Sequence, residues 1–306
     1  MSSQQNRDFD LIDLLLPSEE LSYPTSGKCY CGKEQSNLYK YKRCILNVSI
    51  ADCLGITKDP TSNYMIVMKY YEGGDLHSYL EEVNGILCWR DIIDMLWAIS
   101  EGIKHIHDCE LIHGDLHGGN LLVENEHDSV NVFVADVGVH GPVKKKNPNE
   151  IYGVLPYVAP EILKGSPATN LSDIYSFGII MWTLSAGIRP WCNRPHDLKL
   201  AMEICSGLRP KTIDGAPDVY TQLMKQCWHC DPSKRPTASY LCELLGSWVT
   251  AICDNPIPSE LSDQFDKAEE RKFLDLEKNQ FHQQKIHPQA FYVSRSLYFP
   301  ELVNLC

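Results

Sequence analysis

The chain has 306 residues, of which 43% are hydrophobic, so it can bury one substantial core but has little room for further modules. A net charge of −12 disfavours nucleic acid and acidic membrane surfaces as partners, because both need clustered Lys and Arg side chains. Acidic residues within 1–17 and the lack of a long apolar run argue against a signal peptide and a membrane span, so we predict a soluble cytoplasmic protein without a membrane partner.

Residues 1–47 have the period of neither a helix nor a strand, and we predict that they form an irregular leader. The thirteen cysteines of the chain are odd in number and scattered, which indicates reduced thiols and not a disulfide framework. After the leader, residues 50–55 and 64–70 have the character of short strands on either side of a turn-like stretch at 58–63. We predict a β-hairpin there.

A long amphipathic helix is predicted over 89–109. Alternating spacings of four and three residues place one set of apolar side chains on the same helix face, namely Ile92, Leu96, Ile99, Ile103 and Ile106. A loop at 111–120, short strands at 121–123 and 130–135, and a long loop up to Glu161 follow.

A buried central helix is predicted at 171–186, because this stretch is apolar nearly all round and has Asn170 or Ser172 as a plausible N-cap. Further helices are predicted at 196–205, 218–228 and 237–253, and a polar one at 257–285. The last twenty residues have the composition of an extended tail.

Two aspartates adjoin the short apolar strands, Asp115 in the loop before the first strand and Asp136 directly after the second. Each alone would be an ordinary turn residue. Together with Asn120, five residues after Asp115, they supply what phosphoryl transfer needs: a carboxylate to accept the proton of an attacking hydroxyl, and oxygen ligands for magnesium.

The order of these residues resembles the protein kinase family, whose catalytic loop is H-R-D-L-x-x-x-N, followed by D-F-G and A-P-E. The chain has His113–Asn120, Asp136–Gly138 and Ala159–Glu161 in that order, and the likeness continues through 172–178 and 227–236. The resemblance covers 48–250 and implies an α+β, protein kinase-like fold: a truncated β N-lobe at 48–74, a mostly α-helical C-lobe at 75–250, and a C-terminal helix and tail at 251–306.

The resemblance also implies the roles of individual residues. Asp115 would be the catalytic base, with Asn120 and Asp136 holding Mg²⁺. The adenine ring of ATP would lie against the hinge, where Met68 is the gatekeeper, the backbone groups of Lys69 and Tyr71 face the base, and Leu122 packs beneath it. The structural set implied by the resemblance is a Glu161–Arg235 pair inside the lobe, Asp173 bracing the catalytic loop, and His113.

Parts that normally hold the ATP phosphates are missing from the sequence. Before Val48 the chain has Gly27 and Gly32 but no G-x-G-x-x-G, and the best substitutes for the phosphate-binding lysine are Lys40 and Lys42. Between Lys42 and the first strand there is room for little more than one helical turn at about 1.5 Å per residue. The usual Lys–Glu pair therefore cannot be assembled in the usual way.

Other departures concern control and specificity. Gly114 replaces the arginine of the catalytic loop, and no Ser or Thr lies between Gly138 and Tyr157, which argues against switching by phosphorylation of that segment. His117 matches neither the lysine usual in Ser/Thr kinases nor the alanine usual in Tyr kinases. The acceptor, Ser/Thr or Tyr, therefore stays open, although residues 153–161 resemble tyrosine-kinase-like Ser/Thr enzymes.

The leader contains stretches at 29–33 and 39–44 that resemble pieces of a zinc-ribbon-like element found ahead of some fungal-type kinases. A structural zinc site takes four ligands, usually as two close pairs, and Cys44 has no cysteine partner after it nearer than Cys53. We therefore favour free thiols.

Two hypotheses follow. In the first, the chain is an ATP- and Mg²⁺-dependent protein kinase acting on a protein substrate in signalling. In the second, it is a pseudokinase or truncated kinase that serves as a scaffold for a signalling partner, because the parts that hold the phosphates are missing.

Overall fold

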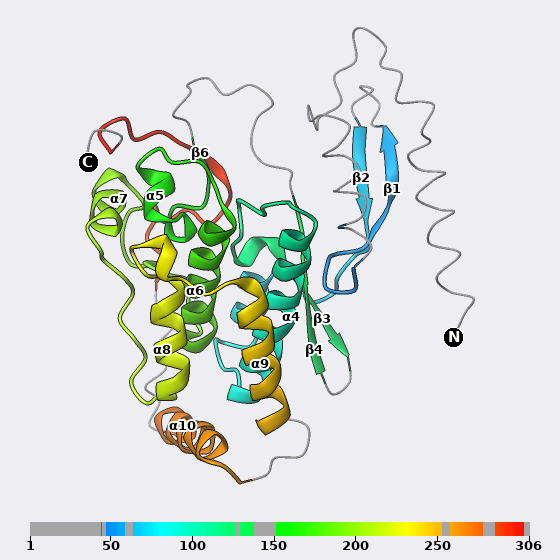
Figure 1. Cartoon of the computed structure of the whole chain (residues 1–306), viewed down its shortest axis with the longest axis vertical. Coiled ribbons are helices and arrows are strands. Elements are labelled where there is room, and N and C mark those ends of the chain that lie inside the picture. Colours follow the sequence, from blue (N-terminus) through cyan, green and yellow to red (C-terminus); the bar gives the residue numbers. More distant parts are fainter. Residues whose placement is uncertain are drawn as a thin grey trace, which may run out of the picture.

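The computed structural model describes residue 44 and the ranges 47–58, 64–126, 129–137, 151–252, 258–277 and 285–302. Most of the predicted leader 1–47 lies outside the described residues, including the zinc-ribbon-like stretches up to Arg43 and the substitute lysines Lys40 and Lys42, as does Gly138. The strands pair two by two in antiparallel fashion, and helices form most of the rest (Figure 1). The strand pairs are β1 (Cys53–Lys58) with β2 (Tyr64–Met68), β3 (Leu121–Glu126) with β4 (Ser129–Val134), and β5 (Ile151–Gly153) with β6 (Arg295–Leu297).

The large lobe is built around the two long helices that periodicity predicted, α4 (Trp89–Asp108) and α6 (Asn170–Ala186). All five isoleucine and leucine side chains of the predicted α4 stripe are fully buried, and each such burial contributes about 1.5–3 kcal/mol. Around them lie α3 (Leu76–Glu82), α5 (Pro160–Leu163), α7 (Leu198–Cys205), α8 (Asp218–Cys227) and α9 (Ala238–Ile252). The α+β kinase-like fold predicted from the sequence is therefore present, with a truncated sheet lobe.

The central helix α6 begins one residue before the predicted start. Thr169 is its N-cap, and the Ser172 hydroxyl, which takes the third helical position, accepts a hydrogen bond from the Thr169 backbone N–H at 3.0 Å. The prediction of Asn170 or Ser172 as the cap was wrong, although Ser172 does belong to the capping box. Gly187 ends the helix in the left-handed conformation that glycine adopts readily.

The predicted hairpin is present, but its first strand begins at Cys53 and not at Ile50. Residues before it pair instead with the edge of β4: the Ala51 N–H donates to the Val134 carbonyl, and the Val134 N–H donates to the Ser49 carbonyl, both at 2.9 Å. Ile50 is therefore buried in the core of the large lobe, whereas Leu54 and Val67 on the hairpin are exposed. Figure 1 shows the hairpin projecting beyond β3 and β4.

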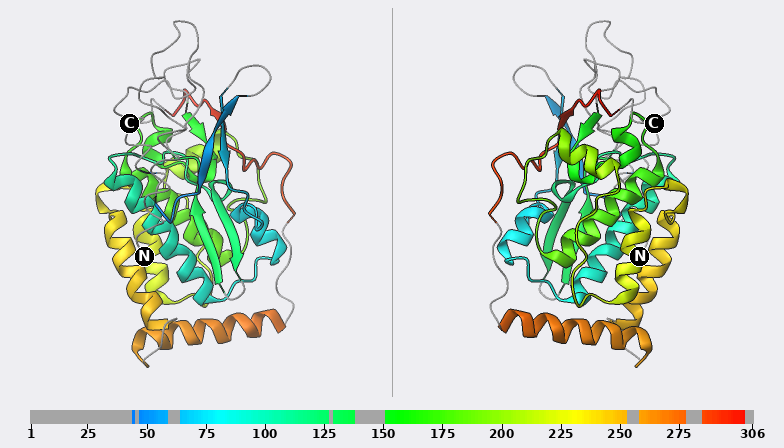
Figure 2. Two further views of the ribbon diagram at one scale, coloured as in Figure 1. Left: turned by 90° about the vertical axis from the view of Figure 1, so that its right-hand side faces the viewer. Right: turned by 90° about the vertical axis from the view of Figure 1, so that its left-hand side faces the viewer.

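The structure has two further helices, of which one was not predicted from the sequence and the other was. Helix α3 was not predicted; its N-cap Asp75 accepts a hydrogen bond from the Ser78 N–H at 2.8 Å. The polar helix was predicted, and α10 (Glu260–Glu277) lies across the ends of the other helices (Figure 2). It is held there by the Glu269 carboxylate, which accepts from the Trp89 N–H at 2.6 Å.

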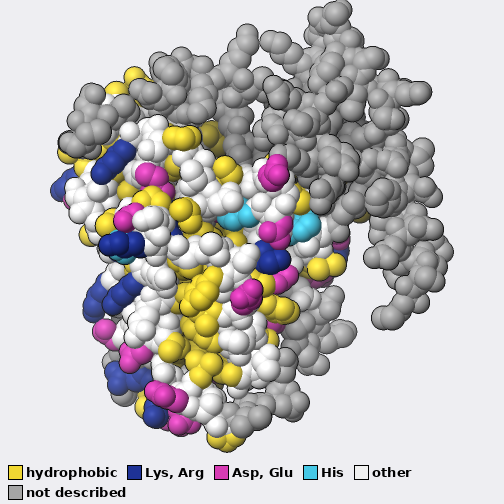
Figure 3. Space-filling model, viewed as in Figure 1, with side chains coloured by type: hydrophobic (Ala, Val, Ile, Leu, Met, Phe, Trp, Pro, Cys, Tyr) yellow, Lys and Arg dark blue, Asp and Glu magenta, His cyan; other side chains and the backbone are white. Residues whose placement is uncertain are grey.

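The described surface has mixed charge. On the face drawn in Figure 3, basic and acidic side chains are interspersed, and a stripe of hydrophobic side chains runs down the lower half. Among the described helices, none has both the length and the apolar character needed to cross a membrane.

Candidate active site

The loop that carries Asp115 is held from below by the Asp173 side chain of α6. The backbone N–H groups of His113 and Gly114 donate to the two Asp173 oxygens at 2.9 and 2.8 Å. His107 of α4 lies 2.9 Å from the same carboxylate. Because one buried carboxylate binds two successive backbone amides, the conformation of the loop is fixed by the central helix.

His113 and Asn120 fix the two ends of the same loop. The fully buried His113 ring donates from Nε2 to the Ala135 carbonyl at 2.9 Å, which links the loop to the residue before Asp136. Burial lowers the pKa of His113, so the ring is neutral. Asn120 donates from its side-chain nitrogen to the Asp115 carbonyl at 2.8 Å, which leaves its amide oxygen as the atom that could bind a metal ion.

The Asp115 carboxylate is largely buried, and this burial raises its pKa to about 7. A hydrogen bond from the Ser294 hydroxyl acts in the opposite direction, and the charge of nearby Asp136 raises the pKa further. Asp136 itself is exposed and has a left-handed backbone with φ of 56°. The structure therefore brings Asp115, Asn120 and Asp136 to one place.

His117 also belongs to this site, although the sequence showed only that it fits no usual pattern. Its Nδ1 accepts a hydrogen bond from the Gly119 N–H at 3.0 Å, and burial, the largest cause, lowers its pKa to about 3. The neutral ring therefore carries its proton on Nε2, which lies 2.7 Å from the Ser294 oxygen and 3.7 Å from Asp115 Oδ1. Nε2 therefore donates to the Ser294 hydroxyl.

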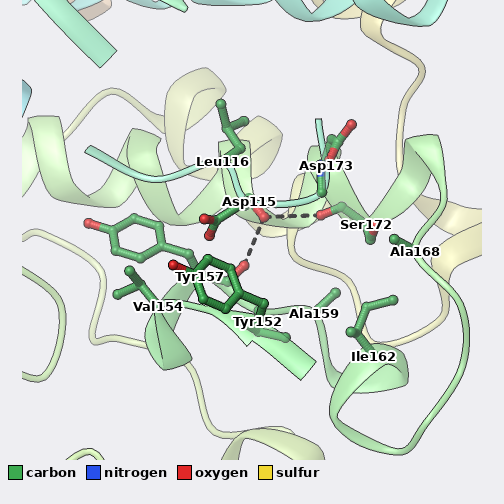
Figure 4. Close-up of a pocket in the computed structure, with 13 residues that line it drawn as sticks. Asp115, Leu116, Tyr152, Val154, Tyr157, Ala159, Ile162, Ala168, Ser172 and Asp173 are labelled. Carbon is green, nitrogen blue, oxygen red and sulfur yellow. Dashed lines mark hydrogen bonds between the residues drawn. The ribbon is translucent and has the colours of Figure 1, made fainter. Parts of the chain in front are cut away.

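A small cavity lies beside Asp115 and is bordered by the segment after β5 (Figure 4). Its volume of about 30 Å³ matches one water molecule and not a side chain or nucleotide. Figure 4 shows Asp115 facing Val154 and Tyr157 across it, with Ser172 and Asp173 on the α6 side. The Ser176 hydroxyl fixes this border, because it lies 2.8 Å from the Tyr157 carbonyl oxygen and 3.2 Å from that of Ser172.

The predicted adenine-binding residues form a separate apolar cluster. Met68 and Leu122 pack against the buried side chains of Tyr71, Ala51 and Ala135. The Tyr71 hydroxyl accepts a hydrogen bond from the Asp52 N–H at 2.9 Å. Tyr71 and Leu122 therefore belong to one apolar cluster, in which the Tyr71 ring lies 5.0 Å from that of Phe133.

Lys69 is held on the edge of this cluster. Its backbone N–H donates to the Asp52 carbonyl at 3.0 Å, and its ammonium group binds Glu124 at 2.8 Å and lies 5.2 Å from the centre of the Tyr71 ring. The hydrogen bond to Glu124 is the main cause that raises the pKa of Lys69. The Lys69 side chain thus lies between Glu124 and the buried Tyr71 ring.

Glu161 and Arg235 are in contact inside the lobe. The Arg235 guanidinium donates to both Glu161 oxygens at 2.7 and 2.8 Å, and also to the carbonyls of Leu171 and His229 at 2.8 and 2.9 Å. Its side chain is 0% exposed and that of Glu161 is 18% exposed. This pair joins α5 to the loop before α9.

Cys44 is the residue of the leader's cysteine-containing stretches that the structure describes. Its thiol lies close to His105 and Cys109, and the three ligand atoms are within 4.8 Å of one another. Burial raises the pKa of Cys44 to about 12, so the thiol keeps its proton. Among the described residues this group offers three ligands, one fewer than a structural zinc site takes.

Comparisons with known proteins agree with this site. The model of the family described as protein tyrosine and serine/threonine kinase matches residues 33–245. A serine/threonine-protein kinase/receptor of Acanthamoeba polyphaga mimivirus is 34% identical over 179 residues, which cover 57% of this chain and 10% of the relative. A serine/threonine-protein kinase of Dictyostelium discoideum is 30% identical, covering 60% of this chain and 11% of the relative.

The serine/threonine-protein kinase STY17 of Arabidopsis thaliana is 27% identical over 200 residues, which cover 65% of this chain and 34% of the relative. The chain thus spans between a tenth and about a third of the length of these relatives. Since the family model matches more than half of the chain, and the family's ordered motifs meet at one braced loop, the chain belongs to the family of protein tyrosine and serine/threonine kinases.

Proposed function

We propose that this chain transfers the γ-phosphate of ATP to serine or threonine hydroxyl groups of a protein. The observation that carries the proposal is the position of the Ser294 hydroxyl, which lies 2.7 Å from His117 Nε2 and beside the buried Asp115 carboxylate, in a loop fixed by Asp173. The acceptor hydroxyl of phosphoryl transfer lies beside the catalytic base in the same way. The relatives named as serine/threonine kinases support the same acceptor class.

Asp115 would orient the acceptor hydroxyl and accept its proton, while the Nε2 proton of His117 holds the acceptor oxygen. The pKa of Asp115 is raised to about 7, so this carboxylate takes up a proton near neutral pH, where proton transfer is effective. Asp173 and His113 act through the loop as positioning residues.

The family uses ATP with Mg²⁺, and the two ligands fit this chain differently. Asn120 and Asp136 supply oxygen atoms of the type that Mg²⁺ prefers, close to Asp115. The adenine site is less clear, because the Tyr71 side chain is buried in the same apolar cluster against which Leu122 packs, and the base would have to lie against this cluster.

A second candidate function is a catalytically impaired scaffold that binds a protein partner. The Gly-rich loop and the phosphate-binding lysine that are missing from the sequence favour it. Because catalysis in this family is mainly positioning and electrostatic stabilisation, losing these parts lowers the rate by orders of magnitude.

The proposal includes finer assignments. The kinase domain is 48–250, with the N-lobe remnant at 48–74, and 251–306 adds the C-terminal helix and tail. We also assign the chain to the tyrosine-kinase-like, fungal-type group, acting in the cytoplasm on a protein substrate or signalling partner. Support comes from the sequence of residues 153–161, which resembles tyrosine-kinase-like Ser/Thr enzymes.

Phosphate incorporation from labelled Mg-ATP into the chain and into an added serine peptide tests the proposal. We expect Asp115→Asn to lower incorporation about 100-fold or more, because a general base contributes about 10²–10⁴ in rate. Asp214→Asn, at a side chain that is exposed, is the matched control and should not change it. Incorporation that is absent in the wild type, or equal in Asp115→Asn, would favour the scaffold.

A thermal-shift measurement with and without Mg-ATP separates binding from chemistry. We expect Tyr71→Ala to bind the nucleotide more tightly than the wild type, because removing this buried ring leaves space in the apolar cluster against which Leu122 packs. Equal shifts for both proteins would mean that the base binds elsewhere.

A further inference from the structure

The described tail, residues 285–302, returns to the candidate active site after α10. Its strand β6 pairs in antiparallel fashion with β5, so that Gly153 lies opposite Arg295 and Ile151 lies opposite Leu297. Figure 1 shows β6, in red, at the end of the large lobe that also carries α5. Ser294, which directly precedes β6, lies 2.7 Å from His117 Nε2 and beside Asp115.

Tyr292, two residues before Ser294, anchors the tail on one side of Asp115. Its ring is buried against His196 and His77, with centroids 4.9 and 5.6 Å apart, and its hydroxyl donates to the Pro190 carbonyl at 2.8 Å. The Arg189 guanidinium lies 5.2 Å from the ring centre. The intervening Val293 is 78% exposed, so the tail presents alternate side chains to the lobe.

Leu297, three residues after Ser294, anchors the other side. It is buried in a small apolar cluster with Leu155, Leu163, Leu200 and Ile204. Between the two anchors, Arg295 donates from its guanidinium to the His196 carbonyl at 3.0 Å. Backbone pairing and two pockets, with a hydroxyl placed between them on a carboxylate, are what an extended peptide ligand uses when it adds a strand to a sheet edge.

We propose that the groove formed by β5, His196 and the Asp115 loop is a peptide-binding site, and that residues 291–297 of the same chain occupy it. The ligand class is an extended peptide with an aromatic residue two positions before a serine and leucine three positions after it. The assignment of Ser294 as the acceptor position rests on the proposed function, whereas the binding itself needs no nucleotide.

Occupation by the chain's own tail would block other peptides. A tethered segment acts at an effective concentration in the millimolar range for a suitable linker, so a free peptide of the same sequence must compete against it. Displacing the tail should therefore raise the affinity of the groove for such a peptide.

Fluorescence anisotropy with a labelled peptide of residues 289–299 tests this on the full chain. We expect Tyr292→Ala and Leu297→Ala to bind it about tenfold or more tightly than the wild type, because each removes one anchor of the competing tail. Val293→Ala is the matched control, since this side chain is exposed and should leave the affinity unchanged. A peptide with alanine in place of Tyr292 should bind to these two variants about tenfold more weakly than the unchanged peptide does, since it lacks the aromatic anchor.

The proposal would be overturned if the wild type and the three variants bound the peptide with equal affinity, or if the alanine peptide bound as tightly as the unchanged one. If thermal unfolding shows that Tyr292→Ala or Leu297→Ala fails to fold, the peptide affinity of the other variant decides, because the two substitutions lie at opposite ends of the segment. The two proposals fail separately: peptide binding without Asp115-dependent phosphate transfer rejects only the proposed function. Phosphate transfer with no gain in peptide binding rejects only the tail as occupant.

Discussion

Replacing Glu161 by alanine should destabilise the chain by about 3–5 kcal/mol, the usual cost of breaking a buried ion pair. The size follows from the surroundings of Arg235, whose side chain is 0% exposed and cannot move into water when its partner is removed. The two carbonyl groups that also bind the guanidinium, those of Leu171 and His229, do not neutralise its charge. Arg235→Ala should cost a similar amount, because these two carbonyls then lose their donor as well.

Urea denaturation followed by circular dichroism measures the change as a shift of the midpoint at constant slope. Asp214→Ala is the control, because its pair with Lys211 joins side chains that are 84% and 85% exposed and should contribute less than about 1 kcal/mol. If both Glu161→Ala and Arg235→Ala unfold like the control, the pair is not a buried structural pair. The reasoning from burial would then be refuted.

Two other predictions use pH and hydrogen exchange. Because the folded protein keeps a proton on Asp115 up to about pH 7 while the unfolded chain loses it near the ordinary value of 3.8, stability should fall as pH rises from about 4 to 7. Urea midpoints should show a smaller fall across this window for Asp115→Asn, and an identical fall would contradict the raised pKa. Backbone amides of Tyr64–Met68 should exchange much faster than those of 174–184, since an isolated hairpin is marginal in water, whereas α6 is buried. Equal protection of the two segments would show that the hairpin is a stable unit.

Periodicity predicted the helices whose buried face can be recognised within their own stretch of sequence. The α4 stripe and the apolar α6 were found because each helix buries residues within one continuous stretch. Helix α3 was not predicted, because its seven residues are too few to show a helical period; the Asp75 cap was the available signal. The start of β1 was misplaced because the apolar Ile50 pairs with β4, a partner far away in sequence.

The residues of the site also fall into two groups, those that the local sequence identifies and those that it does not. Motif spacing identified Asp115, Asn120 and Asp136, because the residues of the loop and of the following strand lie close in sequence. The side chain of Tyr71 could not be placed, since nothing in its own stretch of sequence shows that its ring is buried in an apolar cluster with Ala51 and Ala135. The tail could not be assigned to the site either, because a strand of three residues has no period to detect.

The pairing of β5 with β6 also has a consequence for biosynthesis. Gly153 and Arg295 are 142 positions apart in the chain (295 − 153). At about 5–20 residues per second, the ribosome needs roughly 7–30 s to add the second strand after the first. During this interval the nascent large lobe presents an unpaired strand edge, the condition under which edges pair with other chains. A translational pause before residue 295 would prolong this exposure, so codon usage in that stretch would affect how often the nascent chain associates with other polypeptides.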